Sequence, residues 1–298
     1  MQMRILLCFS CFLLALNLAC ERSEVEPSPD CIGFEDSYTG FGHEPAIYIQ
    51  YPSYEMPYFN PNNSDEIIFR YADGTSQEFD LIKYNWRTQV KETLYTGYFN
   101  KRPRWGKQDW ILLNVLDSLG FNIYKMRSDG TNLTKLTAQN RCFSPEWNYA
   151  SDQFIYRLDE VGSDIFIISD INGQPLDSVL VGPETFGSWQ HPYLFANGSY
   201  LGLFIGNLTT SEYGLIYDPG ALAQSLNGAE WFDEQRVIWC HTTGIYITDV
   251  FSKTTTQIRS TCNTDTYQFP SYAPEIDKVI FQRMQRIKTG VEERVGKA

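Results

Sequence analysis

Between residues 122 and 156 the chain alternates polar and apolar positions in short runs that are separated by turn residues. Residues 122–127 alternate as a half-buried strand does, and residues 128–130 supply the Asp and Gly that a hairpin turn needs. Residues 133–137 predict the return strand. A second hairpin opens at Pro145, turns at residues 151–152 and closes at residues 154–156. This stretch therefore predicts four short strands and two tight turns.

The same pattern recurs along the chain, at intervals of about 40 to 45 residues. Its marker is a Pro-x-Trp anchor, which occurs as Pro103-Arg104-Trp105 and Pro145-Glu146-Trp147. Degenerate copies are Pro192-Tyr193, Ala229-Glu230-Trp231 and Pro270-Ser271-Tyr272. Second strands are expected at residues 111–113, 154–156, 201–204, 237–239 and 279–281, and third strands at 123–124, 165–166, 215–217 and 245–246.

This repeat predicts an all-β fold, a six-bladed β-propeller with four-stranded antiparallel blades, over residues 32–288. Blade one is expected to start near residues 51–54. An N-terminal strand within residues 34–50, best at 46–49, is expected to complete the last blade, because open sheet edges favour aggregation. The alternatives are that the C-terminal tail supplies this strand or that blade six is incomplete. An unrelated β-sandwich with chance Trp spacing is the competing fold.

One stretch of the repeat reads I-Y-x-M-x-x-D-G-x-N-L-x-x-L-T … F-S-P-x-W. It resembles the repeat of TolB-type periplasmic β-propellers, most closely over residues 122–170 and more loosely over most of the chain after residue 50. The resemblance implies the propeller architecture. It leaves function open, since propellers of this type serve as adaptors, binding modules and enzyme appendages.

The first residues have the pattern of an export signal. Arg4 precedes an apolar run at residues 5–18, and Ala19-Cys20 follows. Residues 1–19 resemble a bacterial lipoprotein signal peptide, which predicts lipidation of Cys20; an ordinary secretory signal is the alternative. Residues 20–31 are expected to be a disordered acidic tether of the kind found on Bacteroidetes surface lipoproteins, and residues 289–298 a charged C-terminal tail. The expected location is the bacterial cell envelope, anchored to the outer membrane on its periplasmic or surface side.

The formal net charge is −12, and 15% of the residues are aromatic. The negative charge argues against nucleic acid and against anionic lipid headgroups as partners, so membrane contact is expected through the lipid anchor only. The aromatic side chains are explained by packing between the flat faces of propeller blades. An aromatic platform that binds glycans is the alternative. A monomer is expected.

Cysteine and histidine are the candidates for bridge or metal chemistry. Cys240 and Cys262 are close enough along the fifth blade for a disulfide, with free buried thiols as the alternative. His191 and His241 could face the axial channel, although ordinary rim positions explain them as well. No Cys pair has the spacing of a metal site, and we expect no metal and no cofactor.

No motif places a nucleophile beside a base, so no catalytic residue is assigned and the chain is expected not to be an enzyme. The hypothesis is a non-enzymatic binding or scaffold propeller for an envelope protein partner. It would bind through rim loops, notably residues 56–65 and 208–212, and through the channel mouth. The alternatives are a glycan-binding surface lipoprotein or an enzyme, such as a lyase, with its site in the propeller channel.

Overall fold

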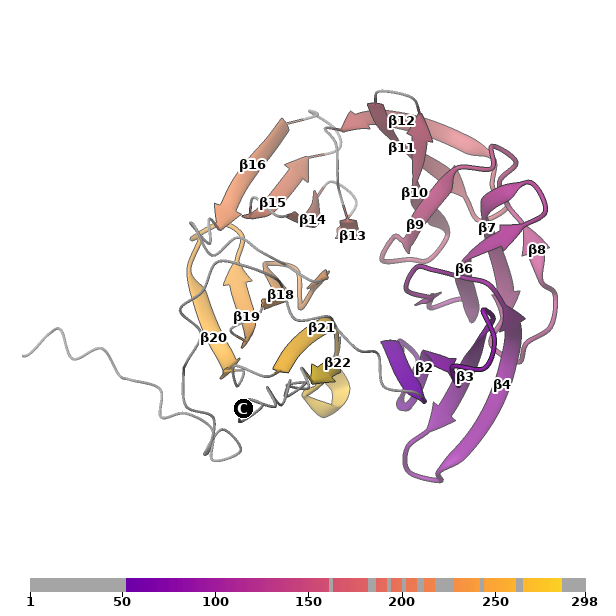
Figure 1. Cartoon of the computed structure of the whole chain (residues 1–298). Helices are drawn as coiled ribbons and strands as arrows, with labels where there is room; N and C mark the ends of the chain where they lie inside the picture. The colour runs from indigo at the N-terminus through magenta and orange to yellow at the C-terminus, as the bar shows by residue number, and fades with distance from the viewer. Residues whose placement is uncertain are drawn as a thin grey trace, which may run out of the picture.

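The computed structural model describes residues 52–160, 163–181, 186–191, 194–199, 202–207, 212–217, 228–241, 244–260 and 265–285. These residues form strands joined by turns, together with one short 3-10 helix, η3 (Pro274–Ile276). The strands build six antiparallel sheets that follow one another around a central axis (Figure 1). Within the described ranges, no helix has the length and apolar character needed to cross a membrane.

Five of the sheets have four strands each, in chain order. They are β1 (Ser53–Asn60), β2 (Asn63–Ala72), β3 (Phe79–Asn85) and β4 (Val90–Gly97); β5 (Arg104–Trp105), β6 (Trp110–Asp117), β7 (Gly120–Arg127) and β8 (Thr134–Lys135); β9 (Cys142–Trp147), β10 (Gln153–Glu160), β11 (Ser163–Asp170) and β12 (Pro175–Val181); β13 (Phe186–His191), β14 (Leu194–Ser199), β15 (Gly202–Asn207) and β16 (Glu212–Tyr217); and β17 (Ala229–Trp231), β18 (Arg236–His241), β19 (Gly244–Asp249) and β20 (Thr255–Ser260). The sixth sheet pairs β21 (Asp265–Ala273) with β22 (Lys278–Gln285).

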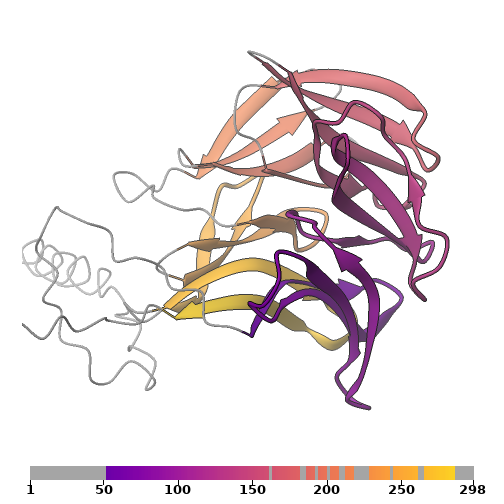
Figure 2. The ribbon, with the colours of Figure 1, turned by 45° about the vertical axis from the view of Figure 1, so that its right-hand side comes forward.

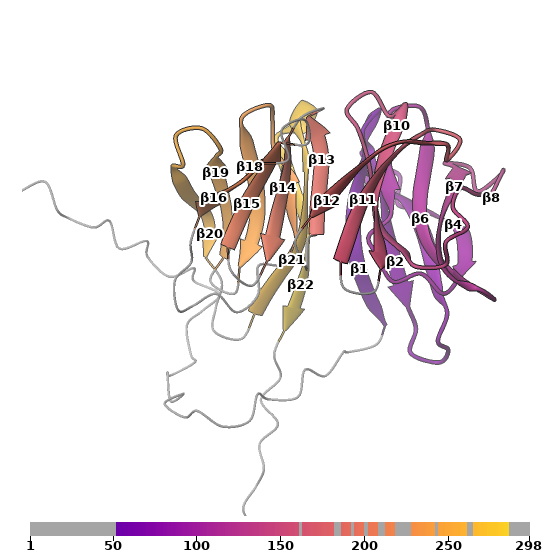
Figure 3. The same cartoon turned by 90° about the horizontal axis from the view of Figure 1, so that it is seen from above.

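The first strand of each sheet lies innermost, and these strands form a closed ring. β1, β5, β9, β13, β17 and β21 each contact the next in the series, and β21 contacts β1. Viewed from above, the sheets stand beside one another around the axis (Figure 3). The predicted all-β propeller with four-stranded antiparallel blades is thereby confirmed. A complete sixth blade stays a prediction, because the closing strand expected within residues 34–50 lies outside the described residues.

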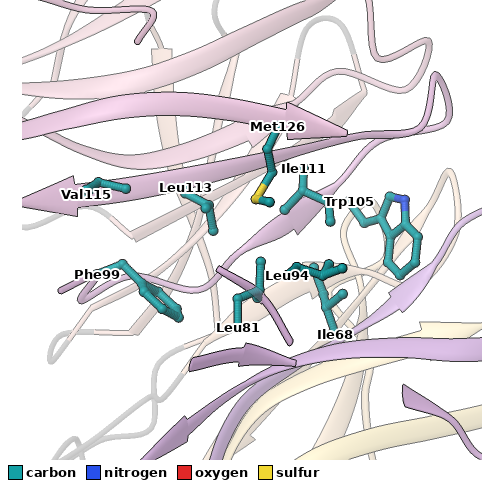
Figure 4. Close-up of a cluster of buried hydrophobic side chains, with 9 residues drawn as sticks. All are labelled: Ile68, Leu81, Leu94, Phe99, Trp105, Ile111, Leu113, Val115 and Met126. Carbon is teal, nitrogen blue, oxygen red and sulfur yellow. The ribbon is translucent and has the colours of Figure 1, made fainter. Parts of the chain in front are cut away.

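Neighbouring sheets are held together by apolar side chains that alternate along their strands. The first and second sheets share a cluster of nine buried residues, shown in Figure 4: Ile68, Leu81, Leu94, Phe99, Trp105, Ile111, Leu113, Val115 and Met126. Fully burying one large apolar side chain stabilises a fold by about 1.5 to 3 kcal/mol. Face-to-face packing of this kind therefore holds the first and second sheets together.

The last sheet packs against the first in the same way and closes the ring (Figure 2). Phe59 on β1 and Ala273 at the end of β21 lie in one buried cluster, with Ile276 and Ile280 packed against it. Two hydrogen bonds cross the same junction: the backbone N–H of Met56 donates to Gln282 Oε1 at 3.1 Å, and that of Phe59 donates to Ser271 Oγ at 3.4 Å. The described junction is therefore made by side-chain packing and a few hydrogen bonds.

Several inner strands share a backbone irregularity just before the anchor. Met56, Ser144 and Phe269, each followed by Pro, have φ of 54°, 51° and 52°, and Gly228 has φ of 80°. At three of these positions the strand register shifts, as in a β-bulge. Left-handed backbone is costly for residues other than Gly, so its repetition at one position marks a feature of the fold rather than an accident.

Two sequence predictions need correction. In the fourth sheet the innermost strand is β13, which carries Trp189, and the proposed anchor Pro192-Tyr193 lies outside the described residues. Residues 202–204 therefore lie in the third strand and residues 215–217 in the fourth, one strand later than expected. Residues 56–65 are not a rim loop: they complete β1, form its turn and begin β2, because alternating burial places Phe59 in the core. Of residues 208–212, only Glu212 is described, and it begins β16.

Candidate functional site

The middle residue of the anchor faces the central axis in several blades. Arg104, Glu146, Glu230 and Ser271 are the middle residues of four predicted anchors, and all are buried. Pro57-Tyr58-Phe59 on β1 has the same form, and Tyr58 is half-buried. Because successive side chains on a strand point to opposite faces, the aromatic residue of each anchor is directed away from this polar group. The repeat thus brings charged side chains of different blades together.

Arg102, just before β5, makes the densest set of contacts at the axis. Its Nε and Nη2 donate to the carbonyl oxygen of Pro57 at 3.0 and 2.7 Å, and Nη2 also donates to that of Pro270 at 2.9 Å. Its Nη1 donates to Glu230 Oε2 at 2.8 Å. One buried guanidinium therefore joins the second blade to the first, fifth and sixth. Both proline carbonyls come directly after the left-handed residues, so the bulges provide acceptors for Arg102.

A second arginine extends the network to the third blade. Arg104 Nη2 contacts Glu146 Oε1, and Arg104 Nη1 lies 3.6 Å from Glu230 Oε2. Both guanidinium groups lie near the ring of Tyr58, Arg102 at 4.9 Å and Arg104 at 5.3 Å from its centroid. When both glutamates are ionised, the two arginines and two glutamates balance in charge, which offsets part of the cost of removing them from water. We call these four residues the axial network.

Burial dominates the electrostatics of this network. It raises the pKa of Glu146 to about 8, although the guanidinium groups of Arg104 and Arg102 oppose that shift, and the nearby Glu230 carboxylate adds to it. Burial also raises the pKa of the Tyr58 hydroxyl, and the two glutamates act in the same direction. Burial lowers the pKa of Arg102, against the attraction of Glu230. Glu146 is therefore the member of the axial network whose charge changes near neutral pH.

A cavity lies on each side of the axial network. One, of about 190 Å³, lies where the inner strands end; its aromatic lining includes Tyr58, Trp105, Trp147, Tyr149, Phe232 and Tyr272. Glu146, Glu230 and Glu275 also line it. We call it the aromatic mouth. The other, of about 240 Å³, lies where the inner strands begin and is lined by Lys101, Arg102 and Arg104 among others. We call it the basic mouth.

The two histidines that the sequence singled out are not brought together. His241 ends β18, is buried, and lies with its ring centroid 6.4 Å from that of Trp239 and 6.5 Å from that of Tyr246. It lines neither mouth. His191 ends the inner strand β13, where its backbone pairs with Leu194. In the described part of the chain, no three residues of the types His, Cys, Asp and Glu are grouped to hold a metal ion.

Of the two cysteines predicted to pair in the fifth blade, only Cys240 is described. Cys240 is a free thiol, buried in β18 within the packing between the fifth and sixth sheets. Burial raises its pKa, which makes it unreactive at neutral pH. Cys262 and Cys20 lie outside the described residues, so a disulfide between Cys240 and Cys262 and the lipidation of Cys20 both stay predictions.

Sequence reasoning found most of the anchors but missed what their middle residues do. Two anchors were also missed, Pro57-Tyr58-Phe59 on β1 and the Trp189 position on β13. A signal for the second was present, since Trp105, Trp147, Trp189 and Trp231 occur one every 42 residues. The roles of Arg102 and Arg104 had no local signal, because the partners of Arg102 are brought to it only by closure of the ring.

No family model matches the chain. No curated protein matches it in sequence either. Solved structures do match. TolB from Acinetobacter baumannii aligns with a TM-score of 0.58 at 14% identity over 76% of this chain, and the chain spans 58% of that protein. The putative TolB from Agrobacterium tumefaciens gives a TM-score of 0.57 at 12% identity, covering 81% of this chain and 93% of that one.

An enzyme has a similar fold as well. Oligogalacturonate lyase from Vibrio parahaemolyticus aligns with a TM-score of 0.52 at 12% identity, over 69% of each chain. At such identities the likeness shows the fold alone. The chain therefore has a TolB-like β-propeller fold, which both TolB and a lyase display.

The raised pKa of Glu146 predicts how stability depends on pH. The folded state holds this proton more tightly than the unfolded state, in which the carboxyl pKa is near its ordinary value of 4.5. This stabilising contribution is complete below about pH 4.5 and is lost as the pH rises through about 8. In Glu146→Gln the free energy of unfolding should no longer fall over this pH range, a difference from the wild type on the order of a few kcal/mol. Urea unfolding at several pH values between 5 and 8 measures it.

Asp129→Asn is the control for this experiment. Hydrogen bonds from Thr131 lower the pKa of Asp129, so its titration falls below the pH window tested. This variant should show the same slope as the wild type between pH 5 and 8. A Glu146→Gln slope that equals the wild-type slope would show that Glu146 does not titrate in this range.

Proposed function

We propose that this chain is a non-enzymatic binding propeller of the bacterial cell envelope, which captures a protein partner at the aromatic mouth. The observation that carries the proposal is the aromatic mouth itself, a cavity at the end of the axis to which five of the six sheets contribute lining residues. Its side chains are of the types enriched in protein interfaces, and they are mounted on a rigid ring of strands.

Individual contacts support this role for the mouth. Tyr149, in the turn after β9, is 59% exposed, and the Lys107 ammonium lies 3.2 Å from the centroid of its ring. On the opposite side, Phe232 and Tyr272 stack with ring centroids 3.8 Å apart. Exposed Tyr and ordered aromatic pairs offer large contact area at low cost in conformational entropy. A protein surface with apolar and cationic groups would suit these rings and the glutamates behind them.

The axial network favours binding over catalysis. A general acid or base must exchange its proton with substrate, whereas Glu146 and Glu230 are each held by a buried arginine. Each glutamate pairs with an arginine of the second blade and so joins its own blade to that one. The sequence likewise has no motif that places a nucleophile beside a base, and the absence of a catalytic site is part of the proposal.

The glycan-binding alternative calls for exposed Trp or Tyr along one rim. Trp105, Trp147, Trp231 and Trp239 are instead buried, each with 6% exposure or less. Among the described aromatic side chains that line the aromatic mouth, only Tyr149 has the exposure that a sugar platform would use, and one ring stacks one sugar. A protein partner therefore accounts better for the mouth as a whole.

The envelope location rests on the N-terminal sequence, and the fold shared with TolB agrees with it. We expect the lipid on Cys20 to be the only membrane attachment. Replacing Cys20 with Ser should move the protein from the membrane fraction to the soluble fraction after cell lysis, as detected by immunoblot. Membrane association that persists in Cys20→Ser would contradict a lipid anchor at this residue.

Capture of a partner tests the aromatic mouth. The full chain serves as bait for cross-linked envelope extract, and captured proteins are identified by mass spectrometry and then purified for affinity measurement. Tyr149→Ala removes an exposed ring from the mouth and should weaken binding of the identified partner about tenfold or more, as loss of an interface hot spot does.

The matched control is Leu119→Ala. Leu119 is 70% exposed, lies in the turn between β6 and β7 of the second blade, and does not line the aromatic mouth. This variant should bind the partner as the wild type does. If Tyr149→Ala binds the partner as tightly as the wild type does, the partner does not bind at the aromatic mouth. Cleavage of an envelope glycan by the purified protein, abolished in His191→Ala or His241→Ala, would replace a binding role with catalysis.

A further inference from the structure

The sixth sheet has two described strands, whereas each of the other five sheets has four. Among the described residues β22 pairs only with β21. Along its other side, the backbone N–H and C=O groups of β22 therefore form a sheet edge within the described part of the chain. Such an edge favours pairing with a further strand, and native proteins usually cover it.

A third cavity, of about 290 Å³, lies beside this edge. It is lined by Ile280 and Phe281, which are successive residues of β22. Successive side chains of a strand point to opposite faces of the sheet, so a cavity that contacts both residues lies beside the strand rather than over one face. The first sheet supplies the rest of the lining: Tyr54, Pro57, Ile67, Phe69, Tyr84 and Lys91. We call this cavity the blade-six groove.

Packing between the sixth and first sheets is less complete than packing between the first and second. The cluster at the junction of the first and second sheets has nine buried residues, and that at the junction of the sixth and first has five. Tyr71, Tyr84 and Ile280 pack against this second cluster but are only partly buried. Tyr54, in the groove, is 53% exposed. A further segment that covered this apolar area would therefore stabilise the ring.

Strand directions determine which segment can lie in the groove. β21 ends at Ala273 beside the aromatic mouth, so β22 runs from the aromatic mouth toward the basic mouth. β1 runs the opposite way, because Met56 lines the basic mouth and Asn60 lines the aromatic mouth. A strand that leads into β1 from the outer part of the sixth sheet must end at the basic mouth, and it therefore runs in the same direction as β22.

Two strands in the same direction do not lie side by side in this fold. All described pairs of neighbouring strands are antiparallel. One further strand must therefore lie between β22 and the strand that leads into β1. The sixth sheet thus needs a third and a fourth strand, which is the number found in each of the other sheets.

The chain ahead of β1 contains two runs that suit these positions. Residues 34–39 read Phe-Glu-Asp-Ser-Tyr-Thr, and residues 46–50 read Ala-Ile-Tyr-Ile-Gln. The residues between them include Gly40, Gly42 and Pro45, which are typical of turns. In order and length the two runs therefore predict a β-hairpin.

We propose that residues 34–50 form a β-hairpin that occupies the blade-six groove and supplies the third and fourth strands of the sixth blade. The first run pairs with β22 in the antiparallel direction. The second run lies outermost and ends beside β1, and its Ile47 and Ile49 contact the first sheet near Tyr84. The N-terminal and C-terminal parts of the chain then supply two strands each to one blade. This closure does not depend on what the aromatic mouth binds.

The C-terminal residues suit the groove less well. Residues 286–298 follow β22 directly, and six of them are charged. In an extended conformation Val291, Glu293 and Val295 lie on one side, which would bring a carboxylate against the apolar lining. This tail also has no second apolar run, whereas two strands are needed. The N-terminal hairpin therefore accounts better for the groove.

Nuclear Overhauser contacts between backbone protons of the full chain test the pairing. Residues 34–39 should contact both β22 and residues 46–50 in antiparallel register. Contacts between β22 and residues 287–298 would overturn the proposal, as would a free outer edge of β22. In a mixture of differently labelled chains, contacts between β22 of one molecule and residues 34–50 of another would assign the groove to a second copy and overturn closure within one chain.

Variants test which side of the outer strand is buried. Ile49→Lys brings a charge into the groove and should lower Tm by about 5 °C or more. Gln50→Lys is the matched control on the opposite side of the same strand, and Val295→Lys is the control in the C-terminal tail; each should stay within about 2 °C of the wild type.

Equal Tm values for Ile49→Lys and Gln50→Lys would contradict burial of Ile49 in the groove. A lower Tm in Val295→Lys, with Ile49→Lys unchanged, would assign the groove to the C-terminal tail. If Ile49→Lys does not fold, the Overhauser contacts of the wild-type chain decide between these outcomes.

Discussion

The ring depends on the hydrogen bonds of one buried arginine. Arg102 precedes β5, yet its guanidinium donates to the carbonyl oxygens of Pro57 and Pro270 and to the carboxylate of Glu230. These acceptors belong to the first, sixth and fifth sheets, so the group crosses the junction at which the ring closes. Other described contacts at that junction are apolar packing, two hydrogen bonds and the Lys278 ammonium 5.4 Å from the centroid of the Trp86 ring. A positive charge buried at this position must keep all its partners, and it therefore fixes the relative position of four blades.

The same network divides the axis into two chemically different mouths. Glutamates on the third and fifth inner strands face the aromatic mouth, while Lys101 and the arginines face the basic mouth. The axial network separates the two cavities, and Lys107 also lines the aromatic mouth. The raised pKa of Glu146 makes this balance sensitive to pH near neutrality, because protonation of Glu146 leaves a net positive charge among the four residues. The side chains that join the blades therefore also line the two mouths.

Much of the fold was predictable because it is local. The Pro-x-Trp anchor, the alternation of strands and the Asp-Gly turns repeat within each sheet, and they gave the propeller class and most strands. In the fourth sheet the predicted strands are displaced by one, because Pro192-Tyr193 resembles an anchor. The even spacing of Trp189 with the other tryptophans indicates β13 as the innermost strand instead. The axial network was not predictable in this way. Arg102 and Glu230 are 128 residues apart, and only closure of the ring brings them into contact. The sequence of residues 56–65 predicts a loop because Pro and Asn surround Phe59. Phe59 is buried because residues of the sixth sheet pack against it.

The most direct test is a double-mutant cycle between Arg102 and Glu230, measured by urea unfolding. Arg102→Met leaves a buried carboxylate without its partner and should cost about 3 to 5 kcal/mol, with a coupling to Glu230→Gln of about 1 to 3 kcal/mol. The control cycle uses the exposed pair Arg236 and Asp233, whose coupling should stay below about 1 kcal/mol. If the Arg102 cycle gives a coupling no larger than this control, the ring does not depend on Arg102.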